Sequence, residues 1–105
     1  MSYSSLSALE AAQDDAIAAA RRRVVHAEES LANFRSEVTM MQETAHRLAS
    51  NQGIADHPGF RTAFARISNE IEENLRAGGD AVAELEQDVD TLMLKHLDER
   101  EQFLR

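Results

Sequence analysis

The chain has 105 residues, a formal net charge of −8 and no cysteine. Nucleic-acid affinity comes mainly from Lys and Arg neutralising phosphates, so the acidic balance argues against a nucleic-acid binder. The absence of cysteine excludes disulfides and thiolate chemistry. The length suits a single domain, residues 1–105, and the small share of Gly, Pro and aromatic residues is typical of all-α or coiled-coil proteins.

The first half of the chain predicts one long helix, over about residues 5–51. Ser4, Ser5 and Ser7 are candidate N-caps, and Ser7 with Glu10 has the form of a capping box. Apolar residues then recur in alternating steps of four and three, a period of about 3.5 residues that is typical of a coiled-coil seam. The seam consists of Ile17, Ala20, Val24, Ala27, Leu31, Phe34, Val38, Met41, Ala45 and Leu48.

The middle of the chain predicts a turn at residues 52–57. Gly53 follows the last periodic residue and can adopt the left-handed conformation that ends many helices. Asp56 or His57 then caps a second helix, and Asp56 is the better cap by residue type. Pro58 falls in the first turn of that helix, where its missing N–H is tolerated.

The second half predicts a helix over about residues 58–103. Two four-residue steps in succession, Ile67 to Ile71 to Leu75, predict a local stutter. Gly78-Gly79 leaves two alternatives, a continuous but weakened helix or a break, because glycine is unfavourable inside a helix. The seam is Phe60, Phe64, Ile67, Ile71, Leu75, Gly78, Val82, Leu85, Val89, Leu92, His96, Glu99 and Phe103.

The two seams fit each other as an antiparallel hairpin. Facing residues in a hairpin keep a constant sum of residue numbers, as Ile17 with Leu92 and Leu31 with Gly78 do. The same alignment places opposite charges near each other, in the pairs Arg21 with Asp88, Arg23 with Glu86 and Glu43 with Arg66. Agreement of the apolar pattern, the turn and the charges predicts an all-α antiparallel two-helix hairpin.

Several apolar residues lie off the seam and are interface candidates: Met40, Met93, Leu94 and Leu97. An exposed apolar surface usually marks an interface, and a two-fold dimer forming a four-helix bundle would cover it. The alternative reading applies to the off-seam alanines, which suit a helix surface by propensity alone. We therefore predict self-association or pairing with a second helical hairpin.

One layer of the predicted seam is polar, because His96 faces Gln13. Such a layer either fixes the register of the helices or, since histidine titrates near neutral pH, acts as a pH-dependent clasp. Glu43 and His46 have the spacing used in di-iron bundles, but the motif occurs once and both side chains are expected to point outward. We find no catalytic, cofactor-binding or metal-binding constellation and predict that the protein is not an enzyme.

A hairpin of about a hundred residues with a glycine turn at its midpoint resembles the WXG100 (ESAT-6-like) family. That resemblance is architectural, and it implies helical hairpins that pair into four-helix bundles and leave the cell by type VII secretion. The family's Trp-x-Gly turn would fall on Asn51-Gln52-Gly53, so Gly53 is the position that carries over. The family's Tyr-x-x-x-Asp/Glu motif is absent after Met93.

These observations predict a protein-interaction hairpin, either a WXG100-like secretion substrate or partner, or a cytoplasmic coiled-coil adaptor, chaperone or structural protein. The expected partner is a protein rather than nucleic acid, membrane or a small-molecule substrate. Residues 1–5 show no basic region followed by an apolar run. We therefore expect a cytoplasmic location, or export without a cleavable signal peptide.

Overall fold

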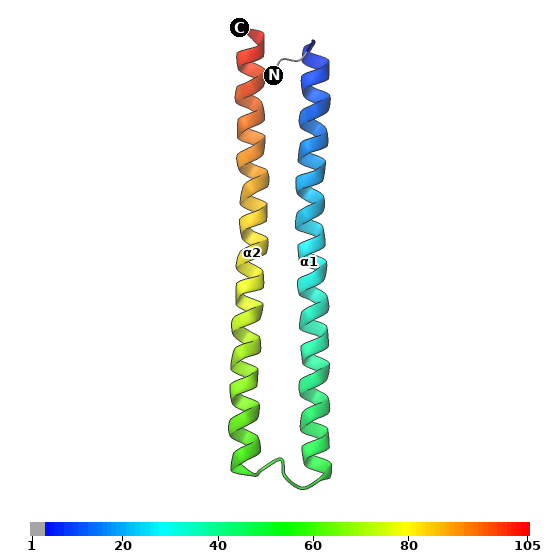
Figure 1. Cartoon of the computed structure of the whole chain (residues 1–105), viewed down its shortest axis with the longest axis vertical. Coiled ribbons are helices and arrows are strands. Elements are labelled where there is room, and N and C mark those ends of the chain that lie inside the picture. Colours follow the sequence, from blue (N-terminus) through cyan, green and yellow to red (C-terminus); the bar gives the residue numbers. More distant parts are fainter. Residues whose placement is uncertain (1–3) are drawn as a thin grey trace. The chain divides into compact units, whose positions relative to one another are not determined.

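The computed structural model describes residues 4–105 and consists of two α-helices (Figure 1). α1 spans Leu6–Asn51 and α2 spans Pro58–Leu104, with no strand in the described part of the chain. The helices pack against each other as the predicted all-α antiparallel hairpin. Neither helix holds an apolar stretch long enough to cross a membrane within the described residues.

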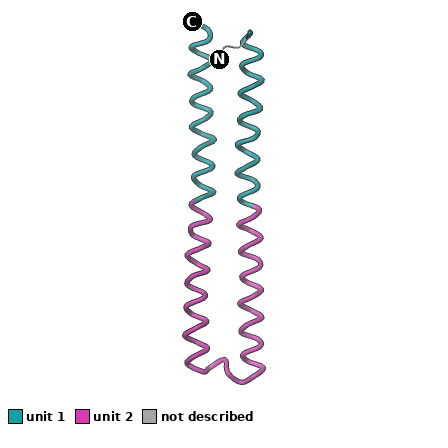
Figure 2. Tube along the Cα trace, viewed as in Figure 1, with its two compact units in different colours: residues 1–28, 81–105 teal, residues 29–80 magenta. Residues whose placement is uncertain are grey.

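The chain divides into two compact units (Figure 2). Unit 1 combines the start of α1, up to Glu28, with Ala81–Arg105 of α2. Unit 2 is the continuous segment Glu29–Asp80, which contains the turn. The single domain predicted from the sequence begins at residues 1–3, which lie outside the described residues.

A serine cap starts α1. The hydroxyl of Ser5 accepts a hydrogen bond from the backbone N–H of Ala8, 3.1 Å away, which satisfies one of the free donors of the first turn. Ser7 lies inside the helix. Of the three candidate caps, Ser5 therefore takes this role, and the predicted capping box of Ser7 with Glu10 is wrong.

Gly53 ends α1 in the left-handed conformation, with φ of 74°. Its N–H donates to the carbonyl of Ser50 at 3.1 Å, and the N–H of Ile54 donates to the carbonyl of Ala49 at 2.8 Å. These two bonds form the Schellman motif, which satisfies carbonyls that the helix end would otherwise leave unpaired. A glycine is favoured here because an L side chain at positive φ is strained.

His57 caps α2 in place of Asp56. α2 begins at Pro58, so the residue immediately before the proline occupies the cap position. The Nδ1 atom of His57 accepts a hydrogen bond from the backbone N–H of Gly59 at 3.0 Å. The choice of Asp56 by residue type was wrong because Pro58 sets the helix start one residue later. Asp56 lies exposed in the turn.

The seam of unit 1 follows the predicted register. Ala20 and Val89 are buried, and Gln13 is hydrogen-bonded to His96 as a facing pair. Leu9, one turn before Gln13 on α1, is also buried and extends the contact toward the N-terminal end. Small side chains such as Ala20 let the helix backbones approach, and larger residues such as Leu85 fill the spaces between layers.

Leu31 packs against the backbone of α2 at Gly78, within unit 2. A Cβ atom added at Gly78 would lie 2.6 Å from Cδ1 of Leu31, so the leucine packs directly against the backbone of α2. α2 continues without interruption through Gly78 and Gly79. The continuous helix is thus the correct alternative, and at Gly78 the cost of a glycine in a helix is offset by this contact.

The seam prediction is wrong near the turn. Three residues assigned to it are more than half exposed: Met41, Leu48 and Ile67. The contact positions are instead Gln42, Ala49 and Ser68, with Gln42 Nε2 donating to Ser68 Oγ at 3.1 Å. Consecutive four-residue steps occur at Phe34, Val38, Gln42 and at Phe60, Phe64, Ser68, so the stutter lies closer to the turn than predicted. The layer was missed because a hydrogen bond, not an apolar pair, closes it.

The predicted surface ion pairs are not formed. Among the described residues, oppositely charged groups within 4.0 Å of each other join Arg100 with Asp14 and Arg105 with Glu101. Arg21 instead directs Nη2 toward Sδ of Met93, 3.9 Å away. Long exposed side chains gain little from pairing in water, so the register alone does not decide their partners.

Candidate functional site

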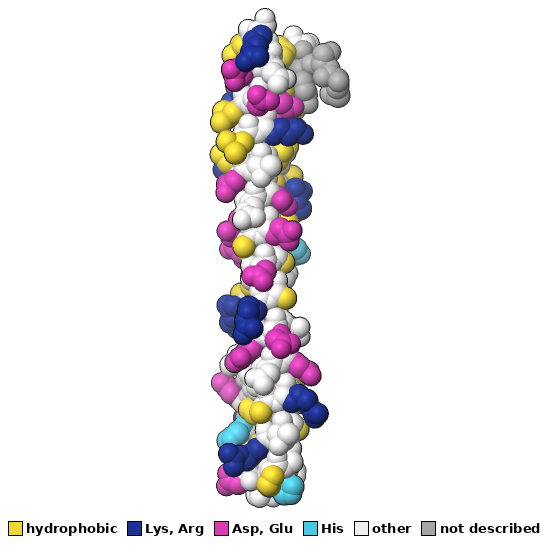
Figure 3. Space-filling model, turned by 90° about the vertical axis from the view of Figure 1, so that its left-hand side faces the viewer, with side chains coloured by type: hydrophobic (Ala, Val, Ile, Leu, Met, Phe, Trp, Pro, Cys, Tyr) yellow, Lys and Arg dark blue, Asp and Glu magenta, His cyan; other side chains and the backbone are white. Residues whose placement is uncertain are grey.

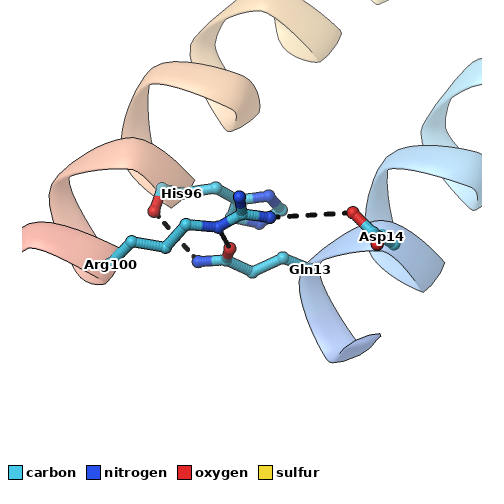
Figure 4. A network of polar contacts seen from close by, with 4 residues as sticks. All are labelled: Gln13, Asp14, His96 and Arg100. Atoms are coloured by element: carbon cyan, nitrogen blue, oxygen red, sulfur yellow. Dashed lines mark hydrogen bonds and ion pairs between the residues drawn. The ribbon is translucent and has the colours of Figure 1, made fainter. Parts of the chain in front are cut away.

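The predicted polar layer lies in the core of unit 1. Gln13 is 4% exposed and His96 is 9% exposed. The side-chain amide of Gln13 donates from Nε2 to the backbone carbonyl of His96 at 3.0 Å (Figure 4). The structure therefore brings the two predicted residues together, through a side chain on α1 and a main-chain group on α2.

Arg100 completes this layer and was missed by the sequence analysis. It lies one turn after His96 on α2, and its Nε donates to Oε1 of Gln13. Its Nη2 atom is 3.7 Å from the carboxylate of Asp14, so Arg100 crosses from α2 to α1 (Figure 4). The available signal was the four-residue spacing from His96, which places both residues on one side of α2.

An open groove runs along one face of unit 1 beside this layer. Its first segment has a volume of about 420 Å³ and is lined by residues of both helices, including Asp14, Ile17, Met93, Leu97 and Arg100. The second segment has a volume of about 470 Å³, and its lining includes Val25, Glu86 and Asp90. Arg21 and Met93 belong to both segments, so the two are continuous.

The groove combines apolar and charged side chains: Arg21 lies beside Met93 where the two segments meet, and other charged groups lie at the ends. Met93 and Leu97 provide the apolar centre, with side chains that are 42% and 63% exposed. Arg100 lies at one end, and the carboxylates of Glu86 and Asp90 lie at the other. Figure 3, seen from the α2 side, shows hydrophobic side chains gathered along one side of α2 toward its C-terminal end.

Three of the four predicted interface residues cluster in unit 1. Met93 and Leu97 line the groove, and Leu94 is next to Met93 on α2 and 68% exposed. Met40, which is 64% exposed, lies on α1 in unit 2 and lines neither segment of the groove. The structure therefore gathers Met93, Leu94 and Leu97 on one surface and leaves Met40 outside it.

The turn forms a second, smaller feature. Gly53 and His57 have the capping roles described above, and Pro58 is the first residue of α2. A shallow apolar hollow beside the turn is lined by Ile54, His57, Gly59 and Phe60. It brings together no set of polar or charged groups that would select a ligand.

His46 is exposed, as predicted, and its ring also lies against aromatic side chains of α2. Its ring lies 6.5 Å from the ring of Phe60 and 6.1 Å from that of Phe64, in tilted and edge-on arrangements that aromatic rings favour. Its contacts are therefore those of a packing residue. No cluster of three or more His, Asp or Glu side chains able to hold a metal ion occurs in residues 4–105.

We compared the chain with models of protein families, with curated proteins and with solved structures. None of the three comparisons found a match.

Proposed function

We propose that this protein is a non-enzymatic interaction module that pairs with another helical hairpin, most simply another copy of itself. The observation that carries the proposal is the exposed apolar surface formed by Met93, Leu94 and Leu97 beside an open groove. A contiguous exposed apolar surface usually marks an interface. Pairing of two hairpins into a four-helix bundle would remove them from water.

Sedimentation of the purified protein tests this pairing. We expect a dimer at tens of micromolar, and we expect Leu94→Glu with Leu97→Glu to make it monomeric, because two carboxylates would have to be buried at the contact. Lys95→Glu is the matched control, since it makes the same change in charge on the side of α2 away from Met93 and Leu97. A wild-type monomer, or a dimer that the double variant leaves intact, would contradict the proposal.

The specific role that we propose is a WXG100-like substrate or partner of type VII secretion. The support is the architecture: α1 has 46 residues, α2 has 47, and they are joined by a turn at Gly53. Export is tested by tagging the protein in its native cell and measuring it in washed cells and in the culture medium, against a cytoplasmic marker. Appearance in the medium that depends on the secretion machinery supports this role.

A second candidate is a cytoplasmic coiled-coil adaptor, chaperone or structural protein. The observation that favours it is the turn itself, where Asn51 stands in place of the tryptophan of the WXG100 family. Retention of the tagged protein in washed cells, together with a dimer in solution, would favour this candidate. Both candidate functions use the same paired hairpin. They differ in whether the pair is exported or stays in the cytoplasm.

A further inference from the structure

A second stripe with coiled-coil spacing runs along α2, beside the seam that packs on α1. Its members recur in alternating steps of four and three residues. All of them line the groove except Leu104, which continues the same spacing toward the end of α2: Glu86, Asp90, Met93, Leu97, Arg100 and Leu104. A stripe with this period can pack along another helix in layers. The helix that packs on it is not α1, since α1 occupies the neighbouring seam.

The stripe is complementary to itself when it runs antiparallel. We propose that two copies of the protein dock through α2 of unit 1, so that Met93 of each copy packs against Leu97 of the other. This alignment also places Asp90 of each copy beside Arg100 of the other, and Glu86 beside Leu104 at the two ends of the contact, where the carboxylate keeps its access to water. The proposal rests on the self-association proposed above and adds its surface, its direction and its charge pairs.

Other alignments of the stripe are less favourable. A shift by one heptad in one direction places Met93 against Asp90 and Leu97 against Glu86, so that carboxylates lose water against apolar side chains. A shift in the other direction places Leu97 against Arg100. Parallel pairing in register places Asp90 of one molecule beside Asp90 of the other, and Arg100 beside Arg100. These like charges repel each other. Of these alignments, the one that sets Met93 against Leu97 joins apolar with apolar and acid with base in its central layers, and it pairs a carboxylate with an apolar side chain, Glu86 with Leu104, only at its two ends.

The charge of the groove face also favours a second copy. The chain as a whole has a formal net charge of −8, so two copies repel each other over most of their surface. The groove face is close to neutral, because Arg21 and Arg100 stand against the carboxylates of Asp14, Glu86 and Asp90. The repulsion between copies is therefore smallest where the apolar side chains are exposed.

Charge reversal on the two partners tests the proposed alignment. We expect Asp90→Arg and Arg100→Glu to raise the dissociation constant of the dimer about 30-fold each, because each variant replaces two attractions with two repulsions. The double variant Asp90→Arg with Arg100→Glu should return to within a few-fold of the wild type. An equimolar mixture of the two single variants should also associate, because the mixed dimer restores both opposite-charge pairs.

Two controls have the same change in charge on the other side of α2: Asp88→Arg and Lys95→Glu. They should leave the dissociation constant within a few-fold of the wild type. Arg100→Glu also loses its contacts with Gln13 and Asp14, but the double variant loses them too. Recovery in the double variant therefore reports the contact between copies, and melting curves of all variants check the fold.

The outcomes separate this inference from the proposed function. Suppose that Leu94→Glu with Leu97→Glu dissociates the dimer but the double charge reversal fails to restore association. The proposed self-association is then supported, and the proposed alignment of Met93 with Leu97 is wrong. If the wild type is monomeric at every concentration reached, both are wrong. Restored association in the double variant and in the mixture supports the antiparallel alignment over the other alignments.

Discussion

Gly78 and Gly79 are neighbours in α2, yet alanine at the two positions should have different effects. Glycine in a helix interior costs roughly 0.5–1 kcal/mol relative to alanine. A Cβ added at Gly79 meets nothing within 4 Å, so Gly79→Ala gains that amount without a clash. For a domain of this size the expected rise in Tm is about 2–5 °C.

Gly78→Ala has the same helical gain and a packing cost. Its new Cβ would lie 2.6 Å from Cδ1 of Leu31, whereas carbon atoms in contact are normally about 3.5–4.0 Å apart. Leu31 must move by about 1 Å, and overpacking of this kind costs about 1–3 kcal/mol. We expect Gly78→Ala to be less stable than Gly79→Ala by about that cost, and no more stable than the wild type.

A double-mutant cycle isolates the contact. Leu31→Ala removes the Cδ1 atom that the new Cβ would meet, so Gly78→Ala in that background should be stabilising, as Gly79→Ala is in the wild type. The assay is urea and thermal unfolding followed by the helical circular-dichroism signal at one fixed protein concentration. Equal stabilisation by Gly78→Ala and Gly79→Ala in the wild-type background would refute the close approach of Leu31 to α2.

Three further pairs of substitutions test the helix ends and the seam by the same unfolding assay. Gly53→Ala should cost about 1–2 kcal/mol because of its positive φ, with Gly53→Asn less harmful, and equal stability of both would contradict the left-handed cap. His57→Ala should lower the free energy of unfolding by about 1 kcal/mol, and Asp56→Ala should lower it by under about 0.5 kcal/mol. A larger loss for Asp56→Ala than for His57→Ala would show that Asp56 is the cap. Leu85→Asp should unfold the protein, while Glu43→Gln should leave Tm unchanged. A Leu85→Asp variant that stays folded would contradict the prediction that Leu85 packs in the seam.

The sequence was sufficient for the hairpin because the apolar pattern and the turn agreed, although the third signal, the predicted charge pairs, was wrong. The seam period, the glycine turn and the complementary register predicted two antiparallel helices, and contacts such as Leu31 with Gly78 follow that register. The sequence failed where polar groups form the contact. Gln42 and Ser68 are invisible to an apolar pattern, and the exposed Met41 and Ile67 were taken in their place.

The candidate site was predictable only in part, for a related reason. Gln13 and His96 fall in the seam, so the register alone brought them together. Arg100 lies beside the seam, and its partners depend on where a long flexible side chain finds an acceptor. The same limit explains the failed prediction that Arg21 pairs with Asp88, since register fixes the backbone and not the end of an arginine.

Arg100 connects the buried polar layer with the proposed docking surface. Gln13 and Asp14 hold its guanidinium, and the side chain is 35% exposed in the groove. An arginine already held in place loses less rotamer freedom when it meets a carboxylate of a second copy. Gln13, although buried and out of reach of the partner, is therefore a positioning residue for the association.

Substitution at Gln13 tests this link. Gln13→Ala removes the acceptor for Arg100 and should raise the dissociation constant of the dimer about 5-fold, in line with an ordering cost of about 0.5 kcal/mol for each of the two Arg100 side chains in the dimer. Gln13→Glu keeps an oxygen acceptor for Arg100 but loses the donor to the carbonyl of His96, so it should lower the Tm and still associate more tightly than Gln13→Ala. The Arg100→Ala background separates positioning from packing, because Gln13→Ala should have no further effect once the arginine is absent. If Gln13→Ala weakens association equally with and without Arg100, the glutamine acts through the packing of the hairpin instead.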